Sequence, residues 1–453
     1  MVRVAVRVLA SAVLLLPAAA AQPDQPLAKG VRVREFPLAQ PVPGDGGGGP
    51  FAHDLNGDGR LDFVVTSEGH LGAYDHSGRM LWMRSDDVHL WPYAQHPCAI
   101  AGDLDGDGRQ EVACLADART IVILDGETGA ADGELKLPAD AVALAIANLR
   151  GEGDRDILVQ YSQTHIAAIR ADTGKALWET DEYQGIEHSP LRQADIDGDG
   201  LDEVAGSSII DNDGRKMNDW DIGDVWASMD SIVIADVMPG YPLEVVLAEQ
   251  MGARSHTDVV APGKIVLESL NPWDWEDPDK VAVGDFDPAR PGLEIFNRSS
   301  GGDGVAPRGK EEPFVNEEGP WVIDSSGDLL AKYYVNDHKP EWWTGHGIEE
   351  VCRIDWDGDG ADELVCKERH KSGAAAIVAP LRGEFQEIFP GHATRVYGID
   401  LMGDSREEVV TTDEDGMVRV FRNARPNPNP PRPRPWDLQQ YKRQKQNWNY
   451  YSP

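Results

Sequence analysis

Short apolar runs alternate with acidic, glycine-rich loops along almost the whole chain. A typical unit is GDLDGDGRQEVACLA (102–116), in which carboxylates at alternate positions precede an apolar run. The loop occurs eight times: strong copies begin at residues 54, 103, 195 and 355, and weaker copies at 148, 236, 285 and 400. The first positions of successive copies are separated by 49, 45, 47, 41, 49, 70 and 45 residues. Each loop follows one strand-like run and precedes another, so the pattern predicts a repeated β-hairpin.

The rest of each unit predicts two further strands. A third apolar run such as TIVILD (120–125) follows, and a turn such as Asp125-Gly126 leads to a fourth. A period of this length with about four short strands per unit is typical of a β-propeller. Eight copies predict an all-β, eight-bladed propeller, with a seven-bladed ring and one stray copy as the alternative. The last unit ends after its third strand near Asn423, and we expect VRVREFPL (31–38) to supply the outer strand that closes the ring.

The strong loops have the composition of a calcium site. Oxygens at positions 1, 3 and 5, a backbone carbonyl near position 7 and a carboxylate at position 9 form a hard, oxygen-only ligand set, and the glycines allow the tight turn. The predicted calcium ligands are Asp54, Asn56, Asp58, Asp62, Asp103, Asp105, Asp107, Glu111, Asp195, Asp197, Asp199, Glu203, Asp355, Asp357, Asp359 and Glu363. We expect the bound Ca²⁺ to be mainly structural, and the weaker copies to hold their turns without metal.

The ends of the chain differ from the repeats. Residues 1–22 have the charged, apolar and small-residue order of a secretory signal, so we expect a secreted or periplasmic protein. The propeller is predicted over 23–423. Residues 424–453 are predicted to form a Pro-rich spacer and an aromatic and basic strap that packs on the propeller wall. No segment approaches the length of a transmembrane helix, and we expect a monomer.

Charge and cysteines narrow the alternatives. The net charge of -36 argues against nucleic acid or an anionic membrane as a partner. An exported chain permits disulfides, and we predict Cys98–Cys114 and Cys352–Cys366, because each pair flanks one acidic loop. Two pairs of buried thiols are the alternative.

The face opposite the acidic loops is predicted to carry a different set of side chains. Histidines precede several first strands, and cations and aromatic residues follow several second strands. They include His96, His188, His346, Tyr161, Arg254, Arg298, Lys367, Arg369, His370, Trp342 and Trp343. This set predicts a site for an anionic ligand with flat apolar faces, such as an acidic polysaccharide. The alternative is that these are ordinary surface and core residues.

Two stretches resemble a known family. The acidic loops are of the FG-GAP or VCBS type, and ADIDGDGLDEVAGSSIIDNDG (194–214) and GDFDPARPGLEIF (284–296) resemble family 11 polysaccharide lyases, the rhamnogalacturonan lyases. The resemblance implies a secreted eight-bladed propeller with several calcium ions that cleaves pectin's rhamnogalacturonan by β-elimination. Secreted ulvan lyases, which use seven-bladed propellers, are similar in size. The family places a histidine ahead of this repeat, and His188 matches it, whereas its neighbours Glu187 and Ser189 do not.

β-Elimination on a uronate needs a group that offsets the carboxylate charge, a base and an acid. We assign His188 or His96 as the base and Tyr161 as the acid. Arg298, Arg369 and Lys367 are assigned to bind the carboxylate, because cations offset its charge. Trp342 and Trp343 are predicted to form a sugar platform, and Arg254, His346 and His370 to contact the substrate. A non-catalytic calcium propeller that binds glycans or a protein is the alternative function.

A quinoprotein-like enzyme is a weaker third possibility. It is suggested by AYDHSGRMLW (73–82) and AIRADTGKALWE (168–179). These segments are interpreted more simply as turns between third and fourth strands, with Trp82 and Trp178 packed between blades.

Overall fold

The computed structural model describes most of the chain after the predicted signal. The described residues are 24–27, 30–44, 46–85, 88–90, 96–185, 191–217, 229–249, 256–270, 272, 278–299, 319–343, 347–368, 372–428 and 434–448. The prediction of a signal over 1–22 therefore falls outside the described residues. Among the described residues, no helix is long and apolar enough to cross a membrane.

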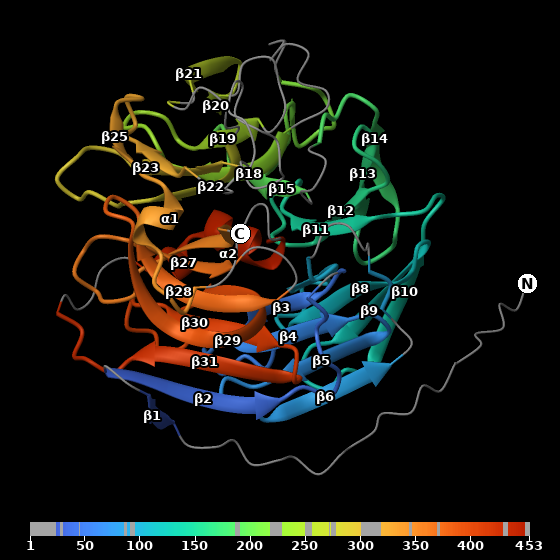
Figure 1. The fold of residues 1–453 in the computed structure, drawn as a ribbon. Coiled ribbons are helices and arrows are strands. Elements are labelled where there is room, and N and C mark those ends of the chain that lie inside the picture. The colour runs from blue at the N-terminus through green and yellow to red at the C-terminus, as the bar shows by residue number, and fades with distance from the viewer. Residues whose placement is uncertain are drawn as a thin grey trace, which may run out of the picture.

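The strands form antiparallel sheets arranged in a ring (Figure 1). Three four-stranded sheets come first: β3 (Gly49–His53), β4 (Asp62–Ser67), β5 (His70–Tyr74) and β6 (Met80–Ser85); β7 (Ala99–Gly102), β8 (Glu111–Asp117), β9 (Thr120–Asp125) and β10 (Ala131–Lys136); β11 (Ala143–Ala147), β12 (Asp156–Gln160), β13 (Ile166–Arg170) and β14 (Ala176–Thr180). Within each sheet the strands pair in chain order, as expected for a propeller blade.

The second half of the ring continues the pattern. It contains β15 (Arg192–Ala194), β16 (Glu203–Ala205) and β17 (Ile209–Ile210); β18 (Met229–Ala235), β19 (Glu244–Glu249), β20 (His256–Ala261) and β21 (Lys264–Leu270); and β22 (Pro278–Gly284), β23 (Glu294–Ser299), β24 (Trp321–Ile323) and β25 (Leu329–Lys332). A short helix, α1 (Val335–His338), follows β25.

The last sheet has eight strands and closes the ring. Its members are β1 (Gln25–Leu27), β2 (Val31–Pro37), β31 (Met417–Asn423), β30 (Glu408–Asp413), β29 (Glu384–Ile399), β28 (Gly373–Ala379), β27 (Glu363–Glu368) and β26 (Ile348–Ile354). β2 pairs with β31 from Val31↔Asn423 to Pro37↔Met417. The prediction that the early apolar run supplies the missing outer strand is therefore confirmed.

One long strand joins the two halves of this last sheet. The first part of β29 pairs with β28 and its second part pairs with β30. Dividing the sheet at β29 gives a count of eight blades, one for each acidic loop. The count stays a prediction, because only three strands are described in the sheet of β15 and residues 218–228 lie outside the described part of the chain.

Neighbouring sheets are locked together by tryptophans on outer strands. The indole N–H of Trp82 in β6 donates to the carbonyl of Gly126, 2.7 Å away, in the turn after β9. Trp178 in β14 donates in the same way to the carbonyl of Asn212, also at 2.7 Å. A large apolar ring with a single donor suits a site between sheets that has one exposed carbonyl. The packing predicted for both tryptophans is confirmed.

The C-terminal segment lies inside the ring. It forms a 3-10 turn, η3 (Pro435–Asp437), and a helix, α2 (Gln439–Gln446), which lies at the centre in Figure 1 and contacts β3, β7, β15 and β18. The amide of Gln444 bonds both backbone groups of Ile234, and that of Gln446 bonds both backbone groups of Ala101. The segment was expected on the propeller wall; it packs against the first strands that surround the central channel.

The predicted disulfides are corrected by the structure. All four cysteines are buried thiols. Cys366 is paired across the sheet with Val351, so Cys352 is displaced by one residue, and side chains one residue apart point to opposite faces of a sheet. Cys114 likewise faces Ala99, and Cys98 lies before the strand with its Sγ 3.5 Å from His96 Nε2. Each pair of cysteines does flank one hairpin, as predicted, but the strand register does not place the two side chains opposite each other.

Candidate functional site

The ring has two chemically different ends. Every first strand ends at an acidic loop, so these loops share one end, which we name the acidic-loop face. The first strands begin, and the second strands end, at the other end, which we name the opposite face. The predicted metal ligands lie on the acidic-loop face, and Tyr161, Arg298 and Lys367, at or just after the ends of second strands, lie on the opposite face.

All eight acidic loops share one hydrogen bond. The carboxylate that begins each second strand accepts the backbone N–H of the residue seven positions before it. The donor–acceptor pairs are Leu55–Asp62, Leu104–Glu111, Leu149–Asp156, Ile196–Glu203, Val237–Glu244, Asp287–Glu294, Trp356–Glu363 and Leu401–Glu408, at 2.7–3.3 Å. This bond closes the turn in strong and weak copies alike.

The strong loops also gather carboxylates in a way that fits a cation. Oxygens of Asp103, Asp105 and Glu111 lie within 4.8 Å of one another, and so do those of two further sets, Asp195, Asp197 and Asp199, and Asp355, Asp357 and Glu363. Burial raises the pKa of Glu203 to about 8, and its Oε1 has no hydrogen-bond partner in the described part of the chain. A buried carboxylate oxygen with no donor suits a metal ligand.

Loop carboxylates and amide oxygens in the strong copies also accept backbone N–H groups of their own loop. Asp54, Asn56 and Asp58 bond backbone N–H groups of their own loop, and Asp62 begins β4. Asp357 and Asp359 make equivalent contacts in the strong loop that begins at residue 355. In the second loop, Asp107 accepts the N–H of Arg109. The oxygen-rich donor set is therefore present at all four strong loops.

In three of the weaker loops an arginine bonds a loop carboxylate. Arg150 stands at the third position of its loop and its Nε donates to Asp156 at 2.9 Å. Arg290 bonds Asp287 in another copy, and Arg434 of the C-terminal segment bonds Asp400 at 2.6 Å. A guanidinium supplies positive charge and several donors to a carboxylate. That the weaker copies hold their turns without metal stays a prediction.

On the opposite face two predicted cations stand at the same end of adjacent sheets. Arg298 is the last residue but one of β23, where it is paired with Lys280, and Lys367 is the last but one of β27, where it is paired with Glu350. The first strands of these sheets, β22 and β26, contact each other. All four side chains are at most 2% exposed. Buried charges require polar partners, so this end of the two sheets is a polar region set into an apolar ring.

Further polar side chains extend this region. Thr257 Oγ1 donates to Asn297 Oδ1 at 2.5 Å, and Glu350 Oε2 accepts the N–H of Val396 at 2.6 Å. Sequence reasoning missed Lys280 and Glu350. The strand register could have identified them, since each stands near the start of a first strand and directly across from a predicted cation.

His96 is not placed as a solvent-facing base. It is 3% exposed, and its Nδ1 accepts the backbone N–H of Cys98 at 3.0 Å. Burial, and then the nearby positive charge of Arg192, lower the pKa of His96 to about 3. Its imidazole is therefore neutral and held by the backbone. Arg192, which the sequence analysis did not single out, begins β15 and donates to the carbonyls of Gln444 and Asn447.

The aromatic candidates are more buried than a binding surface requires. Trp343 is 1% exposed and packs edge-on against Phe385, with ring centroids 5.2 Å apart. Trp342 packs on the same apolar cluster. Trp343 therefore offers no face to a sugar, which corrects its assignment to the platform. Tyr161 is half-buried beside His165, and burial, followed by the charge of Glu179, raises its pKa.

His188, Arg254, His346, Arg369 and His370 lie outside the described residues. Their assignments stay predictions.

Comparisons with known proteins agree with this architecture. The FG-GAP-like repeat family matches residues 54–114. Rhamnogalacturonan endolyase YesW of Bacillus subtilis is 25% identical over 452 residues, covering 82% of this chain and 67% of the relative. Rhamnogalacturonan exolyase YesX of the same organism is 24% identical over 478 residues, covering 84% of this chain and 73% of the relative.

Solved structures show the same fold. The crystal structure of the exotype rhamnogalacturonan lyase YesX has a TM-score of 0.64 at 18% identity, covering 93% of this chain and 81% of that one. That of rhamnogalacturonan lyase YesW has a TM-score of 0.64 at 20% identity, covering 96% and 79%. The Dos1 propeller has a TM-score of 0.53 at 13% identity, covering 86% and 93%. The chain thus resembles rhamnogalacturonan lyases over most of its length and has a propeller-like fold.

Proposed function

We propose that this protein is an exported polysaccharide lyase that cleaves a uronate-containing polysaccharide, such as rhamnogalacturonan, by β-elimination. The observation that carries the proposal is the placement of Arg298 and Lys367 at one end of adjacent sheets, away from the acidic loops. In a chain with a net charge of -36, buried cations at one end form a region that attracts a carboxylated ligand. The likeness to two rhamnogalacturonan lyases over more than four fifths of the chain supports the same substrate class.

The reaction needs three kinds of group. A base removes the proton at C5 of the uronate, the electron pair forms the C4–C5 double bond, and the C4–O bond breaks. An acid protonates the leaving oxygen. Because the adjacent carboxylate is negative, its charge must be offset before C5 can lose a proton.

The base is assigned by burial, and the other groups are assigned by their charge and their place in the sheets. We assign the base to His188, because the imidazole of His96 is enclosed and bonded to the backbone. Arg298, Lys367 and Arg369 are assigned to the carboxylate, and Tyr161 to the leaving oxygen. Arg254, His346 and His370 are assigned to the substrate's flanking sugars.

Calcium belongs to the proposal as a structural ion. The four strong loops would hold it through the side chains of Asp54, Asn56, Asp58 and Asp62 and their counterparts in the other three copies. A bound cation would neutralise carboxylates that otherwise repel one another within a single turn. We expect these ions to stiffen the hairpins of the acidic-loop face and so support the sheets that carry the opposite face.

The test is incubation of the mature protein with rhamnogalacturonan, ulvan and polygalacturonate, followed by ultraviolet absorbance of unsaturated uronate. We expect product from at least one of them, and its loss in His188→Ala and Lys367→Met. Lys136→Met, which alters an exposed lysine on the outer strand β10, is the matched control. Binding without any unsaturated product would instead support the non-catalytic glycan-binding alternative.

A further inference from the structure

A pocket lies on the acidic-loop face, where the last sheet meets the first. Its volume is about 550 Å³. It is bounded by the loop at 59–61, the turn at 76–77, the loop at 400–403 and the end of β31. It lies at the other end of the ring from Arg298 and Lys367, so the assignments above make no use of it.

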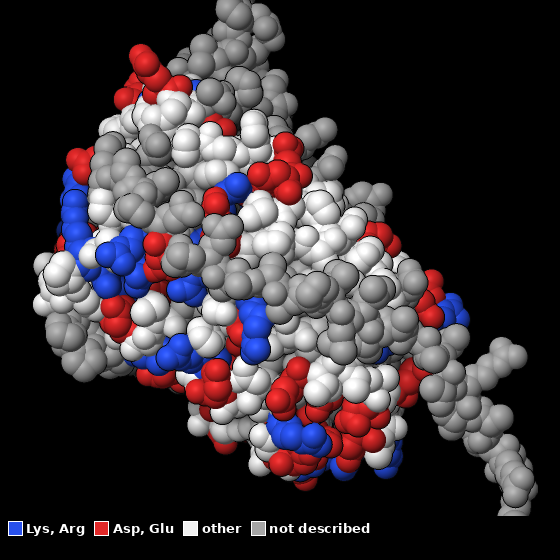
Figure 2. Space-filling model, turned by 90° about the horizontal axis from the view of Figure 1, so that it is seen from below, with Lys and Arg blue, Asp and Glu red and all other residues white. Residues whose placement is uncertain are grey.

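Arginines outnumber carboxylates in the lining of this pocket. They are Arg34, Arg60, Arg422 and Arg434, with His76 beside them, and the acidic members are Asp24, Asp400 and Glu408. The whole chain has 78 acidic and 42 basic residues. In this pocket arginines outnumber carboxylates, whereas in the whole chain acidic residues outnumber basic ones. Figure 2 views the side of the ring that lies at the bottom of Figure 1, where β1 and β2 are labelled, and Lys and Arg gather on its left half.

The pocket already shows how it holds a carboxylate. Asp24 Oδ1 accepts from Arg34 Nε and lies 3.0 Å from Arg34 Nη2, and Asp24 Oδ2 lies 2.5 Å from Arg422 Nη2. Two guanidinium groups from adjacent strands, β2 and β31, thus converge on one carboxylate. Arginine forks match the planar geometry of a carboxylate.

Several donors of the pocket remain unused. Arg422 Nε is buried and has no hydrogen-bond partner among the described residues. Arg60 is exposed, and its one described side-chain contact is with His76 Nε2 at 2.9 Å. His76 Nδ1 also has no hydrogen-bond partner in the described part of the chain and lies 3.9 Å from Asp58 Oδ2. These groups line a cavity whose volume falls within the range of ordinary ligand pockets.

We propose that this pocket is a second glycan-binding site, which takes the carboxylate of a uronate unit through Arg60, with the guanidinium of Arg422 as a neighbouring positive charge. The sugar ring would lie against the apolar side chains that line the same cavity, Leu61, Leu401 and Val420. This inference rests on the substrate class of the proposed function and not on catalysis. A site on the acidic-loop face retains a polyuronate chain on the protein without exposing it to the base.

The experiment measures binding of trigalacturonate to the mature full-length protein by calorimetry. We expect Arg60→Ala to weaken binding at least about tenfold, because a charge-assisted hydrogen bond is lost. Arg60→Lys should retain part of the affinity. Arg109→Ala is the matched control: Arg109 occupies the same position in the second loop, and its guanidinium already contacts Asp107 and Asp125. A galactose trimer, which has no carboxylate, should bind at least tenfold more weakly than trigalacturonate.

Hydrogen exchange separates this pocket from the opposite face. We expect trigalacturonate to slow exchange at 59–61, 76–77 and 401–403, and Arg60→Ala to abolish that protection. Absence of binding to the unaltered protein, equal affinity of the Arg60→Ala variant, or protection confined to other segments would each overturn the inference. The result does not depend on turnover, so the pocket could be confirmed even if no polysaccharide yields an unsaturated product.

Discussion

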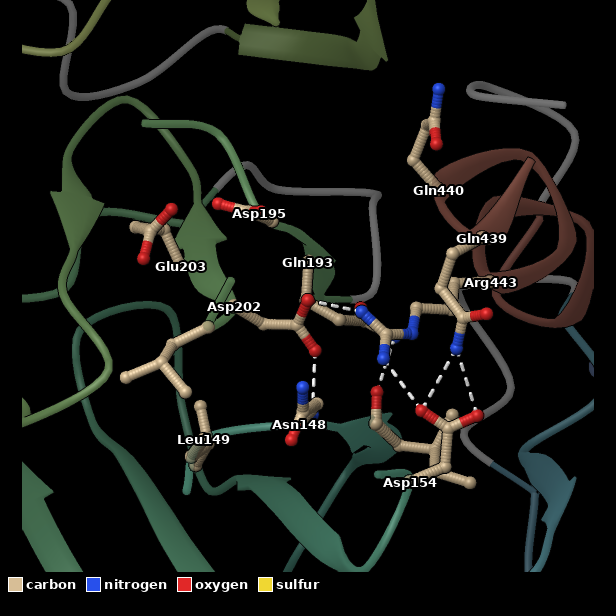
Figure 3. A network of polar contacts seen from close by, with 12 residues as sticks. Asn148, Leu149, Asp154, Gln193, Asp195, Asp202, Glu203, Gln439, Gln440 and Arg443 are labelled. Carbon is tan, nitrogen blue, oxygen red and sulfur yellow. Dashed lines mark hydrogen bonds and ion pairs between the residues drawn. The ribbon is translucent and has the colours of Figure 1, made fainter. Parts of the chain in front are cut away.

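Arg443 and Asp202 lie 241 positions apart in the chain and form an ion pair inside the ring (Figure 3). Both side chains are 4% exposed. The same guanidinium bonds Asp154 at 2.5 Å, and the amide of Gln439 donates to both oxygens of that carboxylate. Asp154 and Asp202 belong to the acidic loops of neighbouring sheets. Helix α2 therefore joins two sheets from within the channel, and its ion pair with Asp202 is buried.

Removal of this guanidinium should destabilise the protein. We expect Arg443→Ala to lower the free energy of unfolding by about 3 kcal/mol, because it leaves the buried carboxylate of Asp202 without its cation. The measurement is urea denaturation at neutral pH. Lys442→Ala alters the preceding helix residue, whose side chain makes no hydrogen bond or ion pair in the described part of the chain, and should change stability by less than about 0.5 kcal/mol. Equal effects of the two variants would contradict a bracing role for α2.

Calcium should stabilise the protein through the strong loops alone. We expect added Ca²⁺ to raise the Tm and chelator to lower it, since an ion that binds only the folded state stabilises that state. Asp105→Ala removes the third-position carboxylate of the second loop and should reduce the calcium-dependent part of the shift. The measurement is thermal unfolding with calcium and with chelator.

Arg150 provides the matched control for that experiment. It occupies the same third position in the weaker loop that begins at residue 148, where it already bonds Asp156. Arg150→Ala should lower the Tm by a similar amount with and without calcium. A calcium shift that is unchanged in Asp105→Ala would contradict the assignment of this loop as a metal site.

Much of the fold could be predicted because it is encoded locally. The acidic loop marks the same hairpin eight times, and the run at 31–38 alternates as an outer strand should. The indoles of Trp82 and Trp178 were placed correctly for the same reason, since each follows a recognisable turn. These features depend on a few consecutive residues, whose pattern is visible in the sequence.

The site was harder to predict because it depends on register and burial. Cys352 and Cys366 flank one loop, but a displacement of one residue separates their side chains. Trp343 looks like a sugar platform in sequence, yet it fills a gap between sheets. The polar helix α2 looks like a surface segment, and only the ring provides the strand edges that its glutamines bond. None of these outcomes has a short-range signature.

The four thiols lead to a simple chemical prediction. We expect the denatured protein to take up four alkylating groups without prior reduction, as measured by intact mass, because all four cysteines are buried thiols. Reducing agent should leave the Tm unchanged. A mass that shows uptake only after reduction would contradict the structure and restore the predicted pairs. Cys98→Ala should not affect the labelling of the other three.

The buried imidazole of His96 should make folding sensitive to acid. Its pKa in the folded protein is about 3, below the ordinary value of 6.5, because burial and the positive charge of Arg192 disfavour the protonated ring. As the pH falls below about 6.5, the unfolded chain takes up a proton that the folded chain refuses. This group therefore contributes stability that is fully present above pH 6.5 and is lost by about 1.4 kcal/mol per pH unit as the pH falls towards 3.

The variant His96→Gln isolates this contribution. Glutamine can still accept the N–H of Cys98 but does not titrate, so the variant should be less stable than the unaltered protein at pH 7. The stability difference between the two proteins should then shrink between pH 6.5 and pH 5, by up to about 2 kcal/mol. Urea unfolding at each pH measures it. A difference that stays constant over this range would show that His96 is protonated equally in the folded and unfolded chains, against the burial seen here.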